Sequence, residues 1–297
     1  MSGEVPEWLK FGRGTPPKLR WSISTDAPLA AMELARETGE VLAADVSGGL
    51  YLINRRGRLS ALTRSFDHLT ALAWNDVGTH FAAVVGESRL SLVDRKFKAL
   101  WSLELPDTIV GLAMSSHGGH LAASLAGGRV IVFDEARRQI ARYETSRPLR
   151  FLRFLTSKPV LIGASEYGLL CARQLDGGEL WSQPLWSNTG DLSVTGDGSS
   201  IFLAGFNQGV QIFDSEGENR GVYVVDGTAD HVSTSFMRRR LAVSTLERHF
   251  YWLDPAGTLR WATALPDAVR ALRCDPSGRG VVCAMEGGRI VRLDWAS

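Results

Sequence analysis

The sequence predicts an all-β fold, a seven-bladed β-propeller with four antiparallel strands per blade. Three observations predict it. Short apolar runs alternate with turn residues throughout the chain, the pattern recurs every 40 residues without insertion, and seven copies follow one another. A period of this length built from four short strands is typical of propeller blades, whereas helical repeats would need an apolar spacing of 3.6.

Length and composition leave room for one large all-β domain. The chain has 297 residues, of which 44% are hydrophobic, enough for an extensive core. Its net charge of +1 argues against general binding of nucleic acid or of acidic substrates. The three cysteines lack Cys-x-x-Cys spacing, so they predict neither a disulfide framework nor a zinc cluster and favour a reducing compartment. No apolar run resembles a signal peptide or a membrane span, so we expect a cytoplasmic protein without membrane insertion.

Residues 1–17 come first, and we expect them to form an N-terminal arm. Their glycines and prolines disfavour regular structure and predict a disordered leader. Trp8 and Phe11, on either side of Lys10, leave open an alternative in which the arm docks on a partner or on the domain itself. Residues 18–297 are expected to form a single propeller, with blades that start near residues 28, 68, 108, 148, 188, 228 and 268.

Lys18–Ser24, with the sequence KLRWSIS, is the first predicted strand and precedes the first repeat. The seventh repeat supplies strands at Ala271–Cys274, Val281–Met285 and Arg289–Leu293, and the chain stops at Ser297 before a fourth. An open ring would expose the unpaired edge of a sheet. Since Lys18–Ser24 lies in the right 40-residue phase, we expect it to complete the last blade and close the ring.

The first two strands of each repeat carry apolar columns. The first strand contributes Met32, Leu72, Leu112, Leu152, Leu192, Val232 and Leu272. The second strand begins at Val41, Phe81, Leu121, Leu161, Ile201, Leu241 and Val281. Glycine marks the turn between them in four repeats, where a positive φ is easiest for this residue: Gly78, Gly118, Gly198 and Gly278.

The third strand ends on a short polar residue in six repeats: Asn54, Asp94, Asp134, Asp214, Asp254 and Asp294. Such a side chain can accept hydrogen bonds from the backbone of the turn that follows. Gln174 is the one departure from this column. We therefore expect these residues to form turns and not to act in catalysis.

The fourth strand carries a tryptophan in every second repeat, at Trp21, Trp101, Trp181 and Trp261. The same column holds Ala61, Ala141 and Gly221 in the repeats between them. On an outer strand a large ring can pack against the neighbouring blade, so the column predicts an alternation of large and small contacts. Because seven is odd, the blades of Trp261 and Trp21 should be adjacent at the closure.

The blade length, the turn glycine, the acid that ends the third strand and the closing strand together resemble WD-repeat and related seven-bladed propellers. No blade has the Gly-His dipeptide of WD repeats. Their Trp-Asp dipeptide occurs only in reversed order, as Asp294-Trp295. Gly178–Trp181 and Gly257–Trp261 are similar to the tryptophan-docking repeats of quinoprotein-like propellers. Neither resemblance transfers a specific function.

No catalytic constellation emerges from the sequence. His117 and His120 fall on a turn, where solvated side chains are expected and too few ligands converge for a metal site. Pyrroloquinoline quinone, which the quinoprotein-like resemblance would imply, is not expected without a secretion signal or matching ligands, so we predict no cofactor. His231, at the start of a first strand, could line a central channel together with Asp191. A ligand-binding or enzymatic site there is the alternative to a non-enzymatic protein.

The predicted loops sort by charge onto two faces. The loops from the fourth strand to the next first strand share one face with the loops from the second to the third strand. That face is predicted to be acidic, with Arg147 as an exception, through Asp26, Asp45, Asp67, Glu87, Asp107, Glu166, Asp226, Glu247, Asp267 and Glu286. Aromatic anchors on or near it are Tyr167, Trp186 and Phe206. The opposite face is predicted to be partly basic through Arg55, Arg56, Arg58, Arg95, Lys96, Lys98, Arg137, Arg138, Arg238, Arg239 and Arg240.

Opposite potentials on two faces favour steered binding of partners. We therefore expect a non-catalytic scaffold that presents its acidic face to one or more proteins, as a subunit of a larger assembly. Contact between the basic face and nucleic acid is a weaker alternative, because aromatic residues are not interleaved with the charges.

Overall fold

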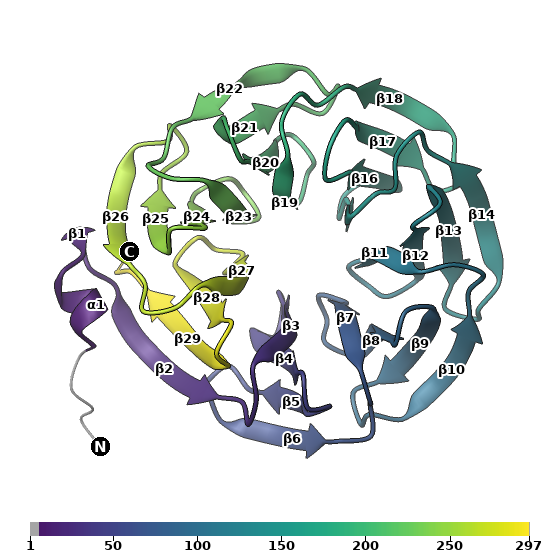
Figure 1. The fold of residues 1–297 in the computed structure, drawn as a ribbon, viewed down its shortest axis with the longest axis horizontal. Coiled ribbons are helices and arrows are strands. Elements are labelled where there is room, and N and C mark those ends of the chain that lie inside the picture. Colours follow the sequence, from purple (N-terminus) through teal and green to yellow (C-terminus); the bar gives the residue numbers. More distant parts are fainter. Residues whose placement is uncertain (1–5, 297) are drawn as a thin grey trace.

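The computed structural model describes residues 6–296, which form a closed ring of seven antiparallel sheets (Figure 1). Six sheets have four strands and one has an additional fifth strand. The predicted all-β, seven-bladed fold is confirmed, including its closure by the strand at Lys18–Ser24. No helix in the described part of the chain is long and apolar enough to cross a membrane.

Each blade consists of four strands, which we letter a to d from the axis of the ring outward. Successive blades follow the 40-residue period (Figure 1). The first three blades comprise β3 (Leu29–Ala35), β4 (Glu40–Asp45), β5 (Leu50–Ile53) and β6 (Leu59–Thr63); β7 (Leu69–Trp74), β8 (His80–Val85), β9 (Arg89–Asp94) and β10 (Ala99–Glu104); and β11 (Ile109–Met114), β12 (His120–Leu125), β13 (Arg129–Asp134) and β14 (Gln139–Glu144). Blades 4 and 5 comprise β15 (Phe151–Phe154), β16 (Val160–Ala164), β17 (Leu170–Gln174) and β18 (Glu179–Gln183); and β19 (Thr189–Val194), β20 (Ile201–Gly205), β21 (Gly209–Phe213) and β22 (Asn219–Tyr223). Blades 6 and 7 comprise β23 (Ala229–Thr234), β24 (Leu241–Thr245), β25 (His249–Leu253) and β26 (Leu259–Ala264); and β27 (Val269–Cys274), β28 (Gly280–Met285), β29 (Arg289–Asp294) and β2 (Lys18–Ser24).

The turns after strand c have the predicted polar geometry. In blade 6, Oδ1 of Asp254 accepts hydrogen bonds from the backbone N–H groups of Ala256 (3.0 Å) and Thr258 (2.9 Å). Blade 4 has Gln174 at this position, and there Asp176 accepts from the N–H of Gly178 at 2.9 Å instead. Asn54, Asp94, Asp134 and Asp214 accept in the same way, as their spacing predicted, whereas Asp294 pairs with Arg20 and Arg292.

The hydrophobic core lies between the blades, in seven clusters that each combine two neighbouring sheets. For example, Met32 and Val41 of blade 1 pack with Val282 and Ile290 of blade 7. This arrangement follows from the strand sequences, because strands b and c are apolar on both faces and each face meets a different blade.

Ring closure joins the two ends of the fold. β2 pairs in antiparallel register with β29, with Ser22 opposite Val291 and Ile23 opposite Ile290. In Figure 1 the purple β2 lies along the yellow β29 as the outermost strand of blade 7. Arg20 and Asp294 add an ion pair across this seam at 2.7 Å.

The outer-strand tryptophans dock on the next blade. The indole Nε1 of Trp21 donates to the carbonyl of Arg55 at 3.1 Å. Trp101 and Trp181 make the same hydrogen bond to carbonyls of the following blade, to Glu135 at 3.0 Å and to Ser215 at 2.8 Å. Each of these indoles, buried at Trp21 and half-buried at Trp101 and Trp181, thus satisfies its N–H at the turn after strand c.

The expected alternation of large and small contacts is wrong as a description of the packing. Tyr143 and Tyr223, two residues after Ala141 and Gly221, lie against the turn glycines Gly177 and Gly257 of the next blades. A residue two positions along a strand lies on the same face, so it can supply the missing ring. In blade 2 the turn itself supplies a ring, because Phe97 packs against the same hydrophobic cluster as Ala61.

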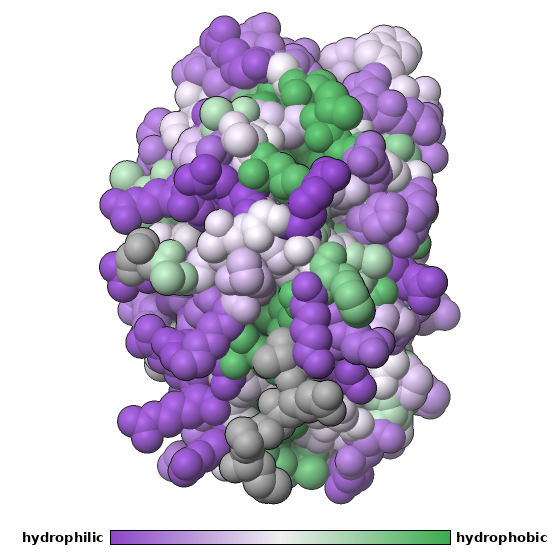
Figure 2. All heavy atoms as spheres, turned by 90° about the vertical axis from the view of Figure 1, so that its left-hand side faces the viewer, coloured by the Kyte–Doolittle hydropathy of each residue, from purple (hydrophilic) through white to green (hydrophobic). Residues whose placement is uncertain are grey.

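The arm docks on blade 6 and is not a disordered leader over its described residues, 6–17. A short helix, α1 (Glu7–Lys10), buries Leu9, and β1 (Arg13–Gly14) pairs with the outer edge of β26. The hydroxyl of Thr263 donates to the carbonyl of Trp8. This confirms the docking alternative for Trp8, whereas Phe11 is 81% exposed. Figure 2 shows the side of the disc that carries the arm, where a few apolar patches lie among polar side chains.

Candidate functional site: the upper face and the central channel

We call upper face the side formed by the loops from strand d to strand a and from strand b to strand c. It comprises residues 25–28, 64–68, 105–108, 145–150, 184–188, 224–228 and 265–268, together with 46–49, 86–88, 126–128, 165–169, 206–208, 246–248 and 286–288. Backbone hydrogen bonds connect the two sets of loops, for example from the N–H of Thr25 to the carbonyl of Gly288 at 3.0 Å. The topology therefore brings the predicted acidic residues to one side.

Several of these acids hold loops in place. Asp107 accepts from the backbone N–H groups of Thr108 and Gly127, both at 2.7 Å. Asp267 repeats this geometry in blade 7, where it accepts from Ala268 and Gly287. Both carboxylates are half-buried. Their oxygens already have partners within the fold.

Two further acids are also used internally. Asp45 is buried and accepts from the Tyr51 hydroxyl at 2.6 Å and from the backbone of Ser47 and Gly49. Glu247 accepts from the N–H of Thr228 at 2.8 Å, and this hydrogen bond lowers the pKa of its carboxyl. Sequence spacing could not separate such structural acids from free ones.

Arginines neutralise other acids of the upper face. Asp26 pairs with Arg64, and Oε1 of Glu166 lies 3.8 Å from Nε of Arg150. By contrast, Asp67, Asp226 and Glu286 are exposed and have no hydrogen bond or ion pair through their carboxylates within residues 6–296. Of the acids predicted on the upper face, these three thus have free carboxylates. The acidic character of the face as a whole stays a prediction.

An arc of exposed apolar side chains crosses the upper face over blades 4 to 6. Trp186 is 79% exposed and Tyr167 is 48% exposed, whereas Phe206 is half-buried. The sequence argument missed Val224 and Leu246, which are 87% and 56% exposed. Their signal in the sequence is an aliphatic residue inside a predicted loop. We call these five residues the apolar arc.

A cavity of about 230 Å³ lies beside Tyr167 at one end of the apolar arc. Val110, Arg147 and Pro148 line it together with Arg150. Arg147, which stood out among the acids in the sequence, thus lies next to an exposed aromatic ring.

The predicted basic residues lie on the lower face, in the turns from strand a to b and from c to d. Some are engaged: Arg95 pairs with Glu40, Arg138 pairs with Asp134, and Arg238 lies over the Phe202 ring. Nine of these cations have no carboxylate partner in the described part of the chain: Arg55, Arg56, Arg58, Lys96, Lys98, Arg137, Arg238, Arg239 and Arg240. Arg239 and Arg240 follow Arg238 in the turn of blade 6.

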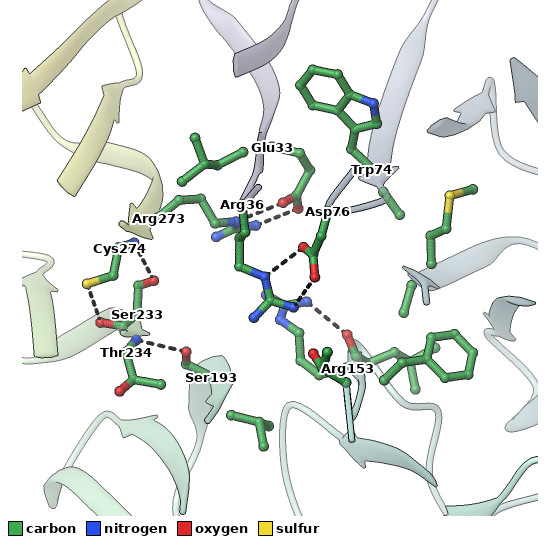
Figure 3. A pocket seen from close by; sticks show the side chains of 18 of the residues that line it. Glu33, Arg36, Trp74, Asp76, Arg153, Ser193, Ser233, Thr234, Arg273 and Cys274 are labelled. Carbon is green, nitrogen blue, oxygen red and sulfur yellow. Dashed lines mark hydrogen bonds and ion pairs between the residues drawn. The ribbon is translucent and has the colours of Figure 1, made fainter. Parts of the chain in front are cut away.

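The a strands line a central channel that contains two cavities. The upper one, of about 370 Å³, reaches the start of the a strands near the upper face. The lower one, of about 110 Å³, lies toward the opposite face (Figure 3). Glu33, Leu112, Arg153 and Arg273 line both cavities, and we call this shared boundary the waist of the channel.

Ion pairs join neighbouring blades along the wall of the channel. Arg273 holds Glu33 in a bidentate pair, with N–O distances of 2.6 and 2.9 Å. Arg36 holds Asp76 in the same way at 2.7 and 2.9 Å. Figure 3 shows these arginines and Arg153 reaching toward the middle of the channel from different strands.

His231 and Asp191 lie together on the channel wall, as the sequence suggested. Nδ1 of His231 is 3.7 Å from Oδ2 of Asp191, and its Nε2 donates to the carbonyl of Val269 at 3.0 Å. Burial alone would lower the pKa of His231, but the negative charges of Asp191 and Asp230 outweigh it, so the pKa is raised above 6.5. Both ring nitrogens of His231 thus already interact with neighbouring residues. Within residues 6–296 no group of three or more His, Cys, Asp or Glu side chains could hold a metal ion.

Comparison with known proteins identifies the architecture. No protein-family model matches the chain. No curated protein matches it either. Among solved structures, the β-propeller domain of Cps50 (Swd1) from Myceliophteria thermophila is similar, with a TM-score of 0.81 and 15% sequence identity over 95% of this chain and 100% of that one. In all, 1833 solved chains match, and a fold shared so widely does not specify an activity.

Proposed function

We propose that the protein is a non-catalytic interaction scaffold that binds a protein partner through the upper face, as a subunit of a larger assembly. The exposure of Trp186 carries this proposal. Trp21, Trp101 and Trp181 of the outer strands dock on neighbouring blades, whereas Trp186 lies in the loop after β18, makes no such contact and presents most of its ring to solvent.

The residues around Trp186 also favour a role in binding a partner. Single exposed aliphatic residues are normal on proteins, and the outer strands carry several of them, such as Leu100 and Leu180. A large aromatic side chain beside further apolar residues is typical of the centre of an interface, where Trp and Tyr contribute most of the binding energy. The cavity next to Tyr167 offers space for a side chain of the partner.

The free carboxylates of the upper face indicate the charge expected of the partner. Asp226 lies in the same loop as Val224 of the apolar arc, and Glu286 in blade 7 and Asp67 between blades 1 and 2 add free carboxylates elsewhere on the upper face, which favours a partner with basic residues. The three thiols are buried and unpaired, which supports a reducing compartment such as the cytoplasm.

The test compares capture of partners by three forms of the tagged protein in its native cells. Trp186→Ala should reduce recovery of a specific partner about tenfold or more, since a hot-spot aromatic contributes about 2 kcal/mol. Met237→Ala is the matched control, because Met237 is 62% exposed in the a–b turn of blade 6 on the opposite face. Equal recovery by Trp186→Ala and wild type, measured by quantitative mass spectrometry, would contradict the use of this face.

A further inference from the structure

The upper cavity of the channel is lined by four arginines from only two blades. Arg150 and Arg153 come from the start of blade 4, and Arg270 and Arg273 from the corresponding positions of blade 7. In β27 the pairing with β28 shifts between Val269 and Ala271, so the bulged Arg270 reaches the same cavity as Arg273. The signal in the sequence is the pattern Arg-x-Leu-Arg, which occurs at both sites.

Only two carboxylates line the same cavity, and neither is available to all four arginines. Glu33 is used by Arg273 in its bidentate pair. Asp191 lies 3.5 Å from Arg153, but it also accepts from the N–H of Leu192 at 2.8 Å and faces His231. Arg153 therefore has one distant ionic partner, which it shares.

The other two arginines are bound mainly to neutral carbonyls. Arg270 donates from Nε to the carbonyl of Ala30 at 3.0 Å and has no ion pair with any described residue. Arg150 donates to the carbonyl of Val110 at 3.3 Å, and its nearest carboxylate, Glu166, stands outside the cavity at 3.8 Å. Positive charge thus exceeds negative charge along the cavity wall.

Such a cavity is an unfavourable place for Arg153 unless an anion enters. Only 32% of its side chain is exposed, and burial together with the nearby charge of Arg273 lowers the pKa of Arg153. Guanidinium groups present planar pairs of N–H donors that match the oxygens of phosphate and carboxylate groups. A bound oxyanion would supply the missing charge and accept these hydrogen bonds.

We propose that the upper cavity binds a small molecule through one oxyanion group, a phosphate or a carboxylate, held by Arg150, Arg153 and Arg270. The cavity volume of about 370 Å³ suits a compact organic anion. The waist that includes Glu33, Arg153 and Arg273 lies below the site, so we expect the ligand to enter from the upper face. Arg150 also lines the cavity beside Tyr167, whereas Arg153 and Arg270 do not, and these two distinguish this site from the apolar arc.

The experiment measures binding of two probes to the full-length chain, inorganic phosphate and citrate. Titration calorimetry and the melting temperature are recorded with each probe against sodium chloride of equal ionic strength. Binding should raise the melting temperature, because the probe stabilises only the folded state. Saturable binding of phosphate alone assigns a phosphorylated ligand, and binding of citrate alone assigns a carboxylate.

Three variants locate the site. Arg153→Gln and Arg270→Gln should each weaken binding by about tenfold, the effect of losing one charge-assisted contact. Arg142→Gln is the matched control, since Arg142 is exposed on the outer strand β14 and lacks an ion pair in the described part of the chain. Should Arg153→Gln fail to fold, Arg270→Gln decides, because Arg270 is exposed and bonds only to the Ala30 carbonyl.

Two results would overturn the proposal. One is the absence of binding of either probe at about 10 mM, a concentration far above the Kd expected of a specific site. The other is binding to Arg153→Gln and Arg270→Gln that equals binding to the wild type.

Discussion

The indole rings of Trp252 and Trp295 lie face to face, with centroids 4.3 Å apart and planes inclined by 8°. Nε1 of Trp295 donates to the carbonyl of Thr15 at 2.9 Å, and its ring meets that of Trp261 edge-on. This aromatic group is where the arm, blade 6 and blade 7 meet. It replaces the turn that receives the docking tryptophan in other blades, so Nε1 of Trp261 is buried without a hydrogen-bond partner.

Truncation of this stack should destabilise the protein. We expect Trp295→Ala to lower the free energy of unfolding by about 2 kcal/mol, because the partly buried ring loses its stacking and its hydrogen bond to the arm. Chemical denaturation measures this change. Trp186→Ala is the control and should change stability by less than about 0.5 kcal/mol, since that ring is exposed. Equal effects of both substitutions would contradict a structural role for the seam.

Deletion of residues 1–24 should be far more damaging than deletion of residues 1–16. The longer deletion removes β2, exposes the edge of β29 and uncovers the apolar surface against which Trp21 packs. We expect a melting temperature lower by roughly 10 °C or more, or self-association through the open edge, because several kcal/mol of burial are lost. Calorimetry and light scattering measure the two outcomes. A monomer with unchanged stability would show that β2 does not close the ring.

The acids of the upper face should separate into two classes. Asp107→Ala removes two hydrogen bonds to backbone N–H groups, so the free energy of unfolding should fall by about 2 kcal/mol. Asp67→Ala should change it by less than about 0.5 kcal/mol, since the Asp67 carboxylate is exposed. Denaturant titration measures both. The same difference makes Asp67 and Asp226 better probes of partner binding than Asp107 and Asp267, whose charge reversal would disturb the turns.

His231 should make stability depend on pH. Its pKa in the folded protein is raised above 6.5 by Asp191 and Asp230 despite burial, so the imidazolium stabilises the fold fully below pH 6.5. This contribution is lost as the pH rises through the folded-state pKa. The stability difference between wild type and His231→Asn should therefore be largest in mild acid and shrink above pH 6.5. Melting temperatures between pH 5.5 and 8.5 test this, and a difference independent of pH would show that His231 is neutral throughout.

The architecture could be predicted from the sequence because it is repetitive. A 40-residue period without insertions places every strand and turn, and the phase of Lys18–Ser24 identifies the closing strand. The docking of the arm could not be predicted in this way, because it depends on contacts such as that between Trp8 and Thr263, which are 255 positions apart and recur nowhere else.

The candidate site was predictable only in part. Topology places loop residues on the correct face, but the sequence does not show which carboxylates have internal partners, as the bond from Gly127 to Asp107 illustrates. The arginines of the upper cavity also escaped prediction. The register shift that brings Arg270 to the cavity recurs at the start of strand a in six blades, but hydrophobic periodicity does not show that four arginines of two distant blades line one cavity.

The pairing of β2 with β29 has a consequence for biosynthesis. Arg20 and Asp294 are 274 positions apart, so β2 leaves the ribosome before any blade exists and its partner follows only after six blades have been made. Each blade can form its hairpins from neighbouring residues during translation, whereas β2 must wait with Trp21 and Ile23 unpaired. The period in which the nascent chain is exposed to aggregation is therefore set by the time needed to synthesise the ring, and not by the stability of any single blade.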